Sequence, residues 1–173
     1  LFNMLNANAA LIIAACGMSI VMITGGIDIS VGGVAALVSM SCAVYLDFHG
    51  GNVFGAILIS LGIGLAFGLI QGFLTAYLDI QPFIVTLAGM FFARGMTTIV
   101  NTKSFNVANE EFVALKETRI IVPGMGSVNR NGVYVNAYIE IGVLVALLVV
   151  IVFFCVLRWT KLGRSFYAVG GNS

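Results

Sequence analysis

The amino-acid sequence predicts an all-α, polytopic membrane protein: a bundle of transmembrane helices that includes a broken-helix or re-entrant turn. Three observations predict this class. Hydrophobic residues make up 60% of the 173 residues and charged residues only 9%, whereas a soluble domain carries about 25% charged residues. The apolar residues form long continuous runs, and a short glycine-rich stretch with an aspartate separates two of them. So few charges cannot cover a water-facing surface, and the bilayer is therefore the expected solvent.

The apolar runs have the length of membrane spans. A helix needs about 20 apolar residues to cross the hydrocarbon core. Helices are expected because the backbone must satisfy its own hydrogen bonds in lipid, and because barrel strands would alternate over about 10 residues instead of running on. Five segments qualify or nearly qualify: residues 5–24, 29–46, 53–77, 82–100 and 138–157.

The connections between these runs give a first indication of orientation. Residues 101–137 form the one long polar connection, in which we expect an ordered external loop. Arg158, Lys161 and Arg164 crowd the end of the last run, and this favours a cytoplasmic end at 158–173, because cytoplasmic flanks are enriched in Lys and Arg. The long loop carries four basic residues itself, so the count tilts the orientation only slightly. Without an initiator Met or a signal peptide, the chain is expected to be a fragment of a longer protein.

The stretch between the first two runs carries the main functional signal. Gly25 and Gly26 can end the first helix by adopting positive φ. Asp28 or Ser30 can then cap the second helix by accepting its free N–H groups. The same residues can also border a polar pathway, because ionisable groups and irregular backbone at membrane depth face a protein interior or a cavity. Both interpretations stay open for the candidate residues of this turn, which are Thr24, Gly25, Gly26, Asp28, Ser30 and Gly32.

The third run shows a pattern typical of close helix packing. Small residues recur every four positions from Ala56 to Ala76, and such a ridge lets a neighbouring backbone approach closely. We expect helix packing rather than a substrate groove at its central members, Ser60, Gly64, Gly68 and Gly72. Gln71 lies beside the ridge, where it can hydrogen-bond across helices or line a pathway.

The fourth run adds three further pathway candidates, Gln81, Phe83 and Arg94. Gln81 and Phe83 flank Pro82, which suits a helix start because its missing N–H would be unpaired there. Arg94 lies about 9 Å of helix before Val100. It can extend its guanidinium to the membrane interface, pair with an acid, or line the pathway.

The sequence offers no set of residues for catalysis or metal binding. The three cysteines are far apart within apolar runs, and the single histidine, His49, lies in a short polar loop. We therefore expect small buried thiols, no catalytic residues and no metal site. The sequence lacks a GxxxxGK[ST] loop, so ATP is not expected to bind here, and a net charge of +1 does not suggest nucleic acid.

Three ordered motifs resemble the permease subunits of ribose/xylose/galactose-type bacterial ABC importers, with the galactofuranose-type permeases nearest. The first runs from Thr24 to Gly32, where the family reads TGGIDLSVGS; Gly33 replaces its final Ser. The second is the Gln81–Leu87 segment followed by Ala93-Arg94-Gly95. The third comprises Leu162-Gly163-Arg164 and Tyr167–Asn172. Together the motifs cover nearly the whole chain.

The resemblance implies an inner-membrane importer of a monosaccharide. Its partners would be a second permease subunit, cytoplasmic ATP-binding subunits that carry ATP and Mg, a periplasmic sugar-binding protein, and membrane lipid. The resemblance also places a side that couples to the ATPase at Gly163, Arg164, Tyr167, Gly170, Gly171 and Asn172. From the residues alone, an ion-coupled secondary transporter is the main alternative; a membrane enzyme and a purely structural module are weaker ones.

Overall fold

Five long apolar helices dominate the computed structural model, which describes residues 2–103, 105–128, 132 and 134–171. Within these residues, five helices are long and apolar enough to cross a membrane: α1 (Phe2–Ile23), α2 (Val31–Phe48), α3 (Val53–Tyr77), α4 (Pro82–Val100) and α6 (Ile141–Trp159). Their ends lie within three residues of the predicted ends. The predicted fold class, an all-α polytopic bundle, is confirmed.

The chain divides into two units, residues 1–24 with 114–173, and residues 25–113. The first unit contains α1, α6, the strands β1 (Arg119–Val128) and β2 (Tyr134–Glu140), and a short helix α7 (Lys161–Gly170). The second contains α2, α3 and α4. Helix α5 (Glu110–Glu117) spans the boundary between the two units.

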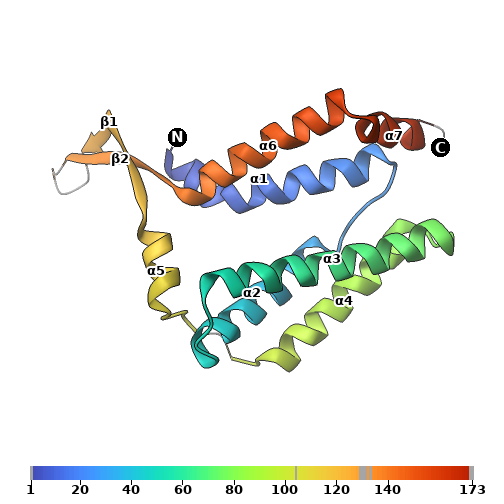
Figure 1. The fold of residues 1–173 in the computed structure, drawn as a ribbon, viewed down its shortest axis with the longest axis horizontal. Helices are drawn as coiled ribbons and strands as arrows, with labels where there is room; N and C mark the ends of the chain where they lie inside the picture. The colour runs from blue at the N-terminus through green and yellow to red at the C-terminus, as the bar shows by residue number, and fades with distance from the viewer. Residues whose placement is uncertain (1, 104, 129–131, 133, 172–173) are drawn as a thin grey trace. The chain divides into compact units, whose positions relative to one another are not determined.

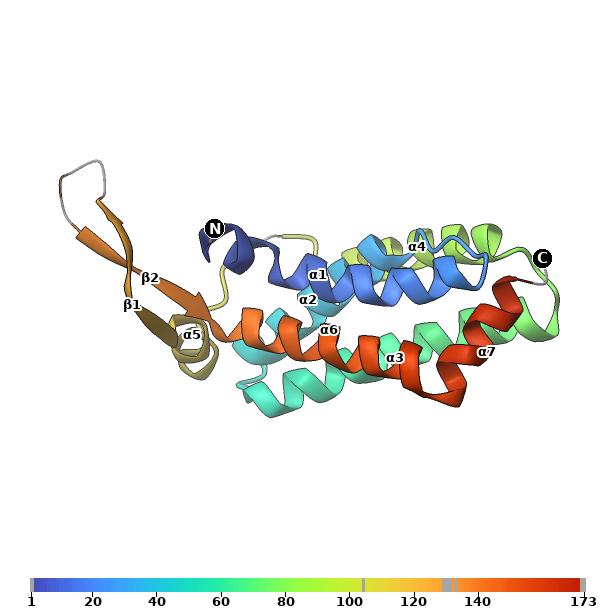
Figure 2. The same ribbon diagram turned by 90° about the horizontal axis from the view of Figure 1, so that it is seen from above.

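In the first unit, α1 and α6 pack side by side and run in the same direction (Figures 1 and 2). Ala9 packs against Val143 and Ala146, which are 1% exposed, to form a small core. The Asn6 amide joins the starts of the two helices, because it donates to the Tyr138 carbonyl at 3.0 Å and accepts from the Glu140 N–H at 3.1 Å. The hairpin lies at the starting ends of α1 and α6, and α7 lies at their final ends.

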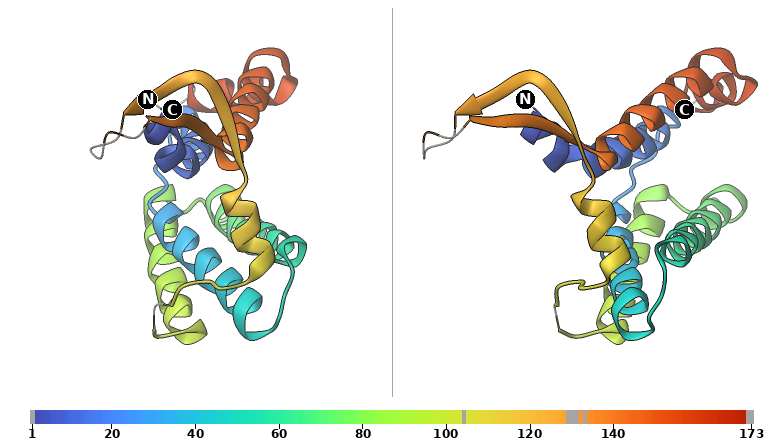
Figure 3. Two further views of the ribbon diagram at one scale, coloured as in Figure 1. Left: turned by 90° about the vertical axis from the view of Figure 1, so that its left-hand side faces the viewer. Right: turned by 60° about the vertical axis from the view of Figure 1, so that its left-hand side comes forward.

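The hairpin is not predicted by the sequence, which indicates a loop at residues 101–137. β1 and β2 pair antiparallel, with a register irregularity between Val122 and Gly126, and Figure 3 shows them side by side. Strand β2 also takes up the predicted start of the last span, so α6 begins at Ile141 instead of residue 138. β-branched and aromatic residues favour this extended pairing, while the glycines and charges around them are typical of a loop.

In the second unit, α2 and α4 run parallel to each other and α3 runs antiparallel to both (Figure 1). The α2–α4 pair is very close, since a Cβ at Gly33 would lie 2.9 Å from the Met90 carbonyl oxygen. Ala93 on α4 is completely buried. The glycine that differs from the family pattern therefore stands where a side chain would meet the α4 backbone.

The small-residue ridge of α3 is covered only near its start. Ala56 is buried, and the Cys42 thiol of α2 lies 3.1 Å from the Ser60 hydroxyl. Further along, the Cβ positions of Gly64, Gly68 and Gly72 have no described heavy atom beyond the helix's own local backbone within 4 Å. The packing expected at these three glycines is thus not provided by α2 or α4 and stays a prediction.

A segment following α4 is fastened to the turn between α2 and α3, which lies at the same end of this unit as the end of α4. The Asp47 carboxylate accepts the backbone N–H groups of Ala108 and Asn109 at 3.0–3.1 Å. The Asn109 amide donates to the Leu46 and Gly51 carbonyls, and its oxygen caps α5 by accepting the Phe112 N–H at 3.1 Å. These contacts tie the start of the long connection to the α2–α3 turn.

Candidate functional site

The break between α1 and α2 is a non-helical segment. Helix α1 closes at Thr24, whose N–H donates to the Ile20 carbonyl at 3.1 Å and whose hydroxyl donates to the Val21 carbonyl at 2.9 Å. Gly25 then adopts φ = 80°, a conformation that glycine adopts without steric penalty. Helix α2 begins only at Val31. The predicted interruption at the glycines is therefore present in the backbone.

This segment contacts α4 at two points. The Thr86 hydroxyl donates to the Ile27 carbonyl at 3.1 Å, and Ser30 lies against Gly89. Thr86 and Gly89 lie about 6 and 10 Å along α4 from its start at Pro82, at 1.5 Å per residue. Helix α2 thus begins well inside the end of the α3–α4 pair, and non-helical backbone accompanies α4 up to that point.

Asp28 organises the end of the segment. Its Oδ1 atom accepts both the Ser30 N–H and the Ser30 hydroxyl, each at 2.7 Å. Ser30 occupies the N-cap position of α2, but its side chain caps no α2 N–H and its backbone is helical at φ = −72°. The sequence leaves the cap of α2 open between Asp28 and Ser30, and Ser30 does not provide it. Asp28 instead binds the residue that precedes the helix, which is a local turn that aspartate readily forms.

Gln71 extends this polar group across to α3. Ser30 is 3% exposed, and its hydroxyl lies 3.2 Å from Gln71 Oε1, while Gln71 Nε2 is buried without a partner among the described residues. A serine hydroxyl has one proton, and the carboxylate of Asp28 accepts it at the shorter distance. The amide therefore pairs best with Ser30 when it is rotated by 180°, as a donor. In either orientation, the second amide atom faces α4 unpaired.

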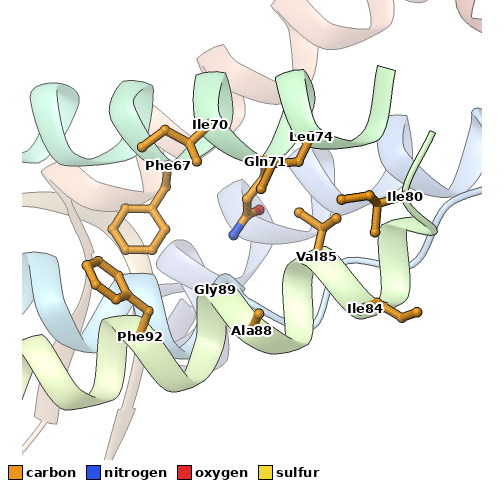
Figure 4. Close-up of a pocket in the computed structure, with 10 residues that line it drawn as sticks. All are labelled: Phe67, Ile70, Gln71, Leu74, Ile80, Ile84, Val85, Ala88, Gly89 and Phe92. Carbon is orange, nitrogen blue, oxygen red and sulfur yellow. The ribbon is translucent and has the colours of Figure 1, made fainter. Parts of the chain in front are cut away.

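Gly89 makes room for this amide. A Cβ at Gly89 would overlap Gln71 Nε2, while the next atom it met, Gln71 Cδ, would lie 3.3 Å away. Figure 4 shows the Gln71 side chain reaching from α3 toward α4 at the level of Gly89. The surrounding cavity of about 400 Å³ is otherwise apolar, with a wall formed by Phe67, Ile70, Leu74, Ile80, Ile84, Val85, Ala88 and Phe92.

The structure brings together only some of the predicted pathway residues. Asp28, Ser30 and Gln71 form one hydrogen-bonded group. Gly32 is exposed and has no heavy atom within 4 Å of its Cβ position. Three candidates on α4 or just before it are exposed and do not join the group: Gln81, Phe83 and Arg94. Thr24, Gly25 and Gly26, at the start of the break, do not join it either.

Two residues that contact the segment or this group, Thr86 and Gly89, are not among the predicted site residues. Thr86 belongs to the second sequence motif, and the clue to it was a hydroxyl in an otherwise apolar helix start. Gly89 carried no signal of its own, because its role depends on the side chain facing it from α3.

The predicted coupling segment forms helix α7, which is anchored by two glycines. The Thr160 hydroxyl caps it by accepting the Gly163 N–H at 3.2 Å. A Cβ at Gly163 would lie 2.5 Å from the Val156 carbonyl oxygen, and one at Gly170 would overlap the Ile23 carbonyl oxygen. Arg164, Tyr167 and Gly171 are exposed, and Asn172 lies outside the described residues.

The structure bears on two further expectations. Cys16, Cys42 and Cys155 are free thiols of intermediate burial, so they are less buried than expected. Among the described residues, no group of three or more His, Cys, Asp or Glu side chains could hold a metal ion.

Apolar helices of membrane-spanning length, interrupted by a non-helical segment that carries an aspartate and contacts α4, define a class: a multi-pass membrane protein with features of a transporter. The whole chain, residues 1–173, matches the family described as branched-chain amino acid transport system / permease component, and it belongs to this family of transport permeases. The predicted resemblance to ABC importer permeases is thereby confirmed.

Named relatives agree with this assignment. The chain is 35% identical over 171 residues to the inner membrane ABC transporter permease protein YjfF of Escherichia coli, covering 99% of this chain and 48% of that protein. It is 34% identical to the fructose import permease protein FruG of Bifidobacterium longum, covering 95% and 47%. It is 33% identical to the ribose import permease protein RbsC of Escherichia coli, covering 99% and 50%. The chain thus spans about half the length of these relatives, and no solved structure matches it.

Proposed function

We propose that this chain forms part of the membrane-spanning permease subunit of an ATP-driven ABC importer that moves a monosaccharide across the bacterial inner membrane. The observation that carries the proposal is the non-helical segment 25–30 between two apolar helices, which contacts α4 through Ile27 and Ser30 and places the Asp28 carboxylate beside the buried Ser30 hydroxyl. Irregular backbone at membrane depth is tolerated where protein covers it or where it lines a water-filled cavity. The relatives named for fructose and ribose import support a sugar as the solute.

The direction of the helices supports the proposed topology. If α1, α2, α3, α4 and α6 each cross the membrane once, α1 and α6 must point the same way, and they pack in parallel. The hairpin and α7 would then lie on opposite sides, since they stand at opposite ends of this helix pair. Arg158, Lys161 and Arg164 favour the cytoplasm for α7.

On this topology, the partner subunits have distinct places. Helix α7 would face the cytoplasmic ATP-binding subunits, which would carry ATP and Mg, with Arg164 and Tyr167 exposed toward them. The hairpin would lie on the periplasmic side, where a sugar-binding protein would dock. A second permease subunit would complete the path. The chain itself would carry no chemistry and would provide the surface along which the solute passes.

The solute path would border the segment from Thr24 to Gly32. The Asp28 carboxylate and Ser30 hydroxyl are hydrogen-bonding groups that suit a neutral polyhydroxylated solute. Close glycine contacts such as Gly33 on Met90 would guide the helices as they shift between outward- and inward-open states. The relatives described above are named as import or ABC permeases, and none of those is named as an ion-coupled carrier.

The proposal is tested by reconstituting the full-length permease with its partner subunits in liposomes. We expect uptake of radiolabelled D-ribose, D-fructose or D-galactose that requires ATP and persists with a protonophore. Asp28→Asn should reduce the uptake rate at least tenfold at unchanged complex yield, while Asp79→Asn, at an exposed turn outside the cluster, should not. Uptake that ignores ATP and collapses with the protonophore would establish an ion-coupled carrier instead.

A further inference from the structure

Gln71 is a polar side chain in a place that favours an apolar one. It stands on α3 within a cavity whose other lining residues are apolar or glycine, and one of its amide atoms is buried without a partner among the described residues. A buried amide without full hydrogen bonding is unfavourable, and a leucine or methionine of similar size would avoid the penalty. Such an atom in a native fold calls for a specific explanation.

A glycine on the facing helix leaves space for this amide. Gly89 on α4 lacks the Cβ that would overlap Gln71 Nε2, so α4 has a gap where the amide enters. Gln71 and Gly89 lie on facing helices, 18 positions apart in the sequence. The gap and the side chain that fills it form a matched pair, which a purely apolar α3–α4 contact would not need.

The amide lies beside a pair of polar groups that can bind hydroxyls. Its partner is the Ser30 hydroxyl, which is itself bound to the Asp28 carboxylate. Asp28 forms no ion pair within the described part of the chain, so its charge is balanced there by hydrogen bonds alone. A carboxamide presents one donor group and one acceptor atom side by side, as two neighbouring hydroxyls of a sugar do.

We propose that Gln71 is the closing residue of this turn: its carboxamide occupies the position beside Ser30 that a hydroxyl of a neutral polyhydroxylated solute takes during transport. This rests on the proposed function and deepens it. With Gln71 in place, the Ser30 side chain is only 3% exposed. When α3 moves away from α4, the amide leaves the gap at Gly89, and Ser30 and Asp28 become available to the solute.

The experiment measures how accessible position 30 is in the full-length complex. A Ser30→Cys variant is made in a background in which serine replaces the native cysteines, Cys16, Cys42 and Cys155. The reagent is 2-aminoethyl methanethiosulfonate, which is small and hydrophilic. We expect slow modification with Gln71 present and modification at least tenfold faster with Gln71→Ala. Thr86→Cys, at a position 6% exposed, is a second reporter in case the first variant assembles poorly.

The control and the solute arm separate closure from a general loosening of the bundle. Leu69→Ala removes a comparable side chain from the exposed side of α3 and should leave the modification rate unchanged. In the Gln71→Ala variant, millimolar amounts of the imported sugar should slow modification at least threefold, and sodium chloride should not.

Equal rates with and without Gln71, or fast modification that sugar does not slow, would overturn the role of Gln71. Failure of the proposed function is distinct from both results, because it would appear as absent ATP-driven sugar uptake by the wild-type complex.

Discussion

The pairing of Gln71 with Gly89 gives a prediction whose magnitude follows from the structure. In Gly89→Ala, the new Cβ takes the place of the Gln71 amide nitrogen, so the amide must leave Ser30. The hydrogen bond that is lost contributes about 0.5–1.5 kcal/mol, and a side chain forced off its rotamer adds about 0.5–1.5 kcal/mol. We therefore expect Gly89→Ala to destabilise the complex by about 1–3 kcal/mol.

The second mutation of the cycle removes the obstacle. Once Gln71→Ala has cleared the amide, the remaining neighbour of a Cβ at position 89 is the Ser30 Cβ at 3.7 Å, an ordinary van der Waals distance. Adding Gly89→Ala to Gln71→Ala should therefore cost almost nothing, and the two substitutions should couple by most of the 1–3 kcal/mol, within the range of roughly 0.5–3 kcal/mol found for contacting residues.

The assay is the thermal unfolding midpoint of the purified full-length complex for the wild type, both single variants and the double variant. Gly89→Ala alone should lower the midpoint, whereas adding it to Gln71→Ala should not lower it further. If the shifts in unfolding midpoint of the two single variants add up to the shift of the double variant, Gln71 does not occupy the gap at Gly89.

Three further predictions concern other close contacts. Gly33→Ala should lower the unfolding midpoint, because its Cβ would lie 2.9 Å from the backbone carbonyl oxygen of Met90. Such overpacking costs about 1–3 kcal/mol. Gly32→Ala is the neutral control, because its Cβ would meet no neighbouring residue within 4 Å. Gly163→Ala should reduce ATP-driven uptake by displacing α7, whereas Gly142→Ala, whose nearest neighbour would lie at 3.7 Å, should leave it unchanged. Asp47→Ala removes the carboxylate that binds the backbone of residues 108 and 109. Chymotrypsin should therefore cleave the segment 105–113 faster in this variant than in the wild type. Equal cleavage would contradict the anchoring role of Asp47.

The helices could be predicted from the sequence because a membrane span depends on local composition and length. The same holds for the break at Gly25, where glycine and apolar run ends coincide. The hairpin could not be predicted in this way, since Tyr134–Glu140 joins directly to an apolar run and its pairing partner lies beyond a stretch rich in glycine and charge. Its pairing is settled by contacts between strands rather than by either segment alone.

The polar cluster was predictable only in part. Asp28 and Ser30 stand out because charge and hydroxyl groups interrupt an apolar sequence. That Gln71 reaches Ser30, 41 residues earlier, depends on how far α2 and α3 slide past each other, and sequence spacing does not fix that. The small-residue ridge on α3 predicts close packing, but the sequence pattern does not identify the helix that packs against it.

The non-helical stretch before α2 also has a consequence for the reach of the chain. An extended residue advances about 3.3 Å, while a helical residue advances about 1.5 Å. Each residue that wound onto the start of α2 would shorten the tether to Thr24 by almost 2 Å and turn the helix by about 100°. A single added or deleted residue between Gly26 and Ser30 would therefore redirect every side chain of α2, which makes the length of this tether as constrained as its composition.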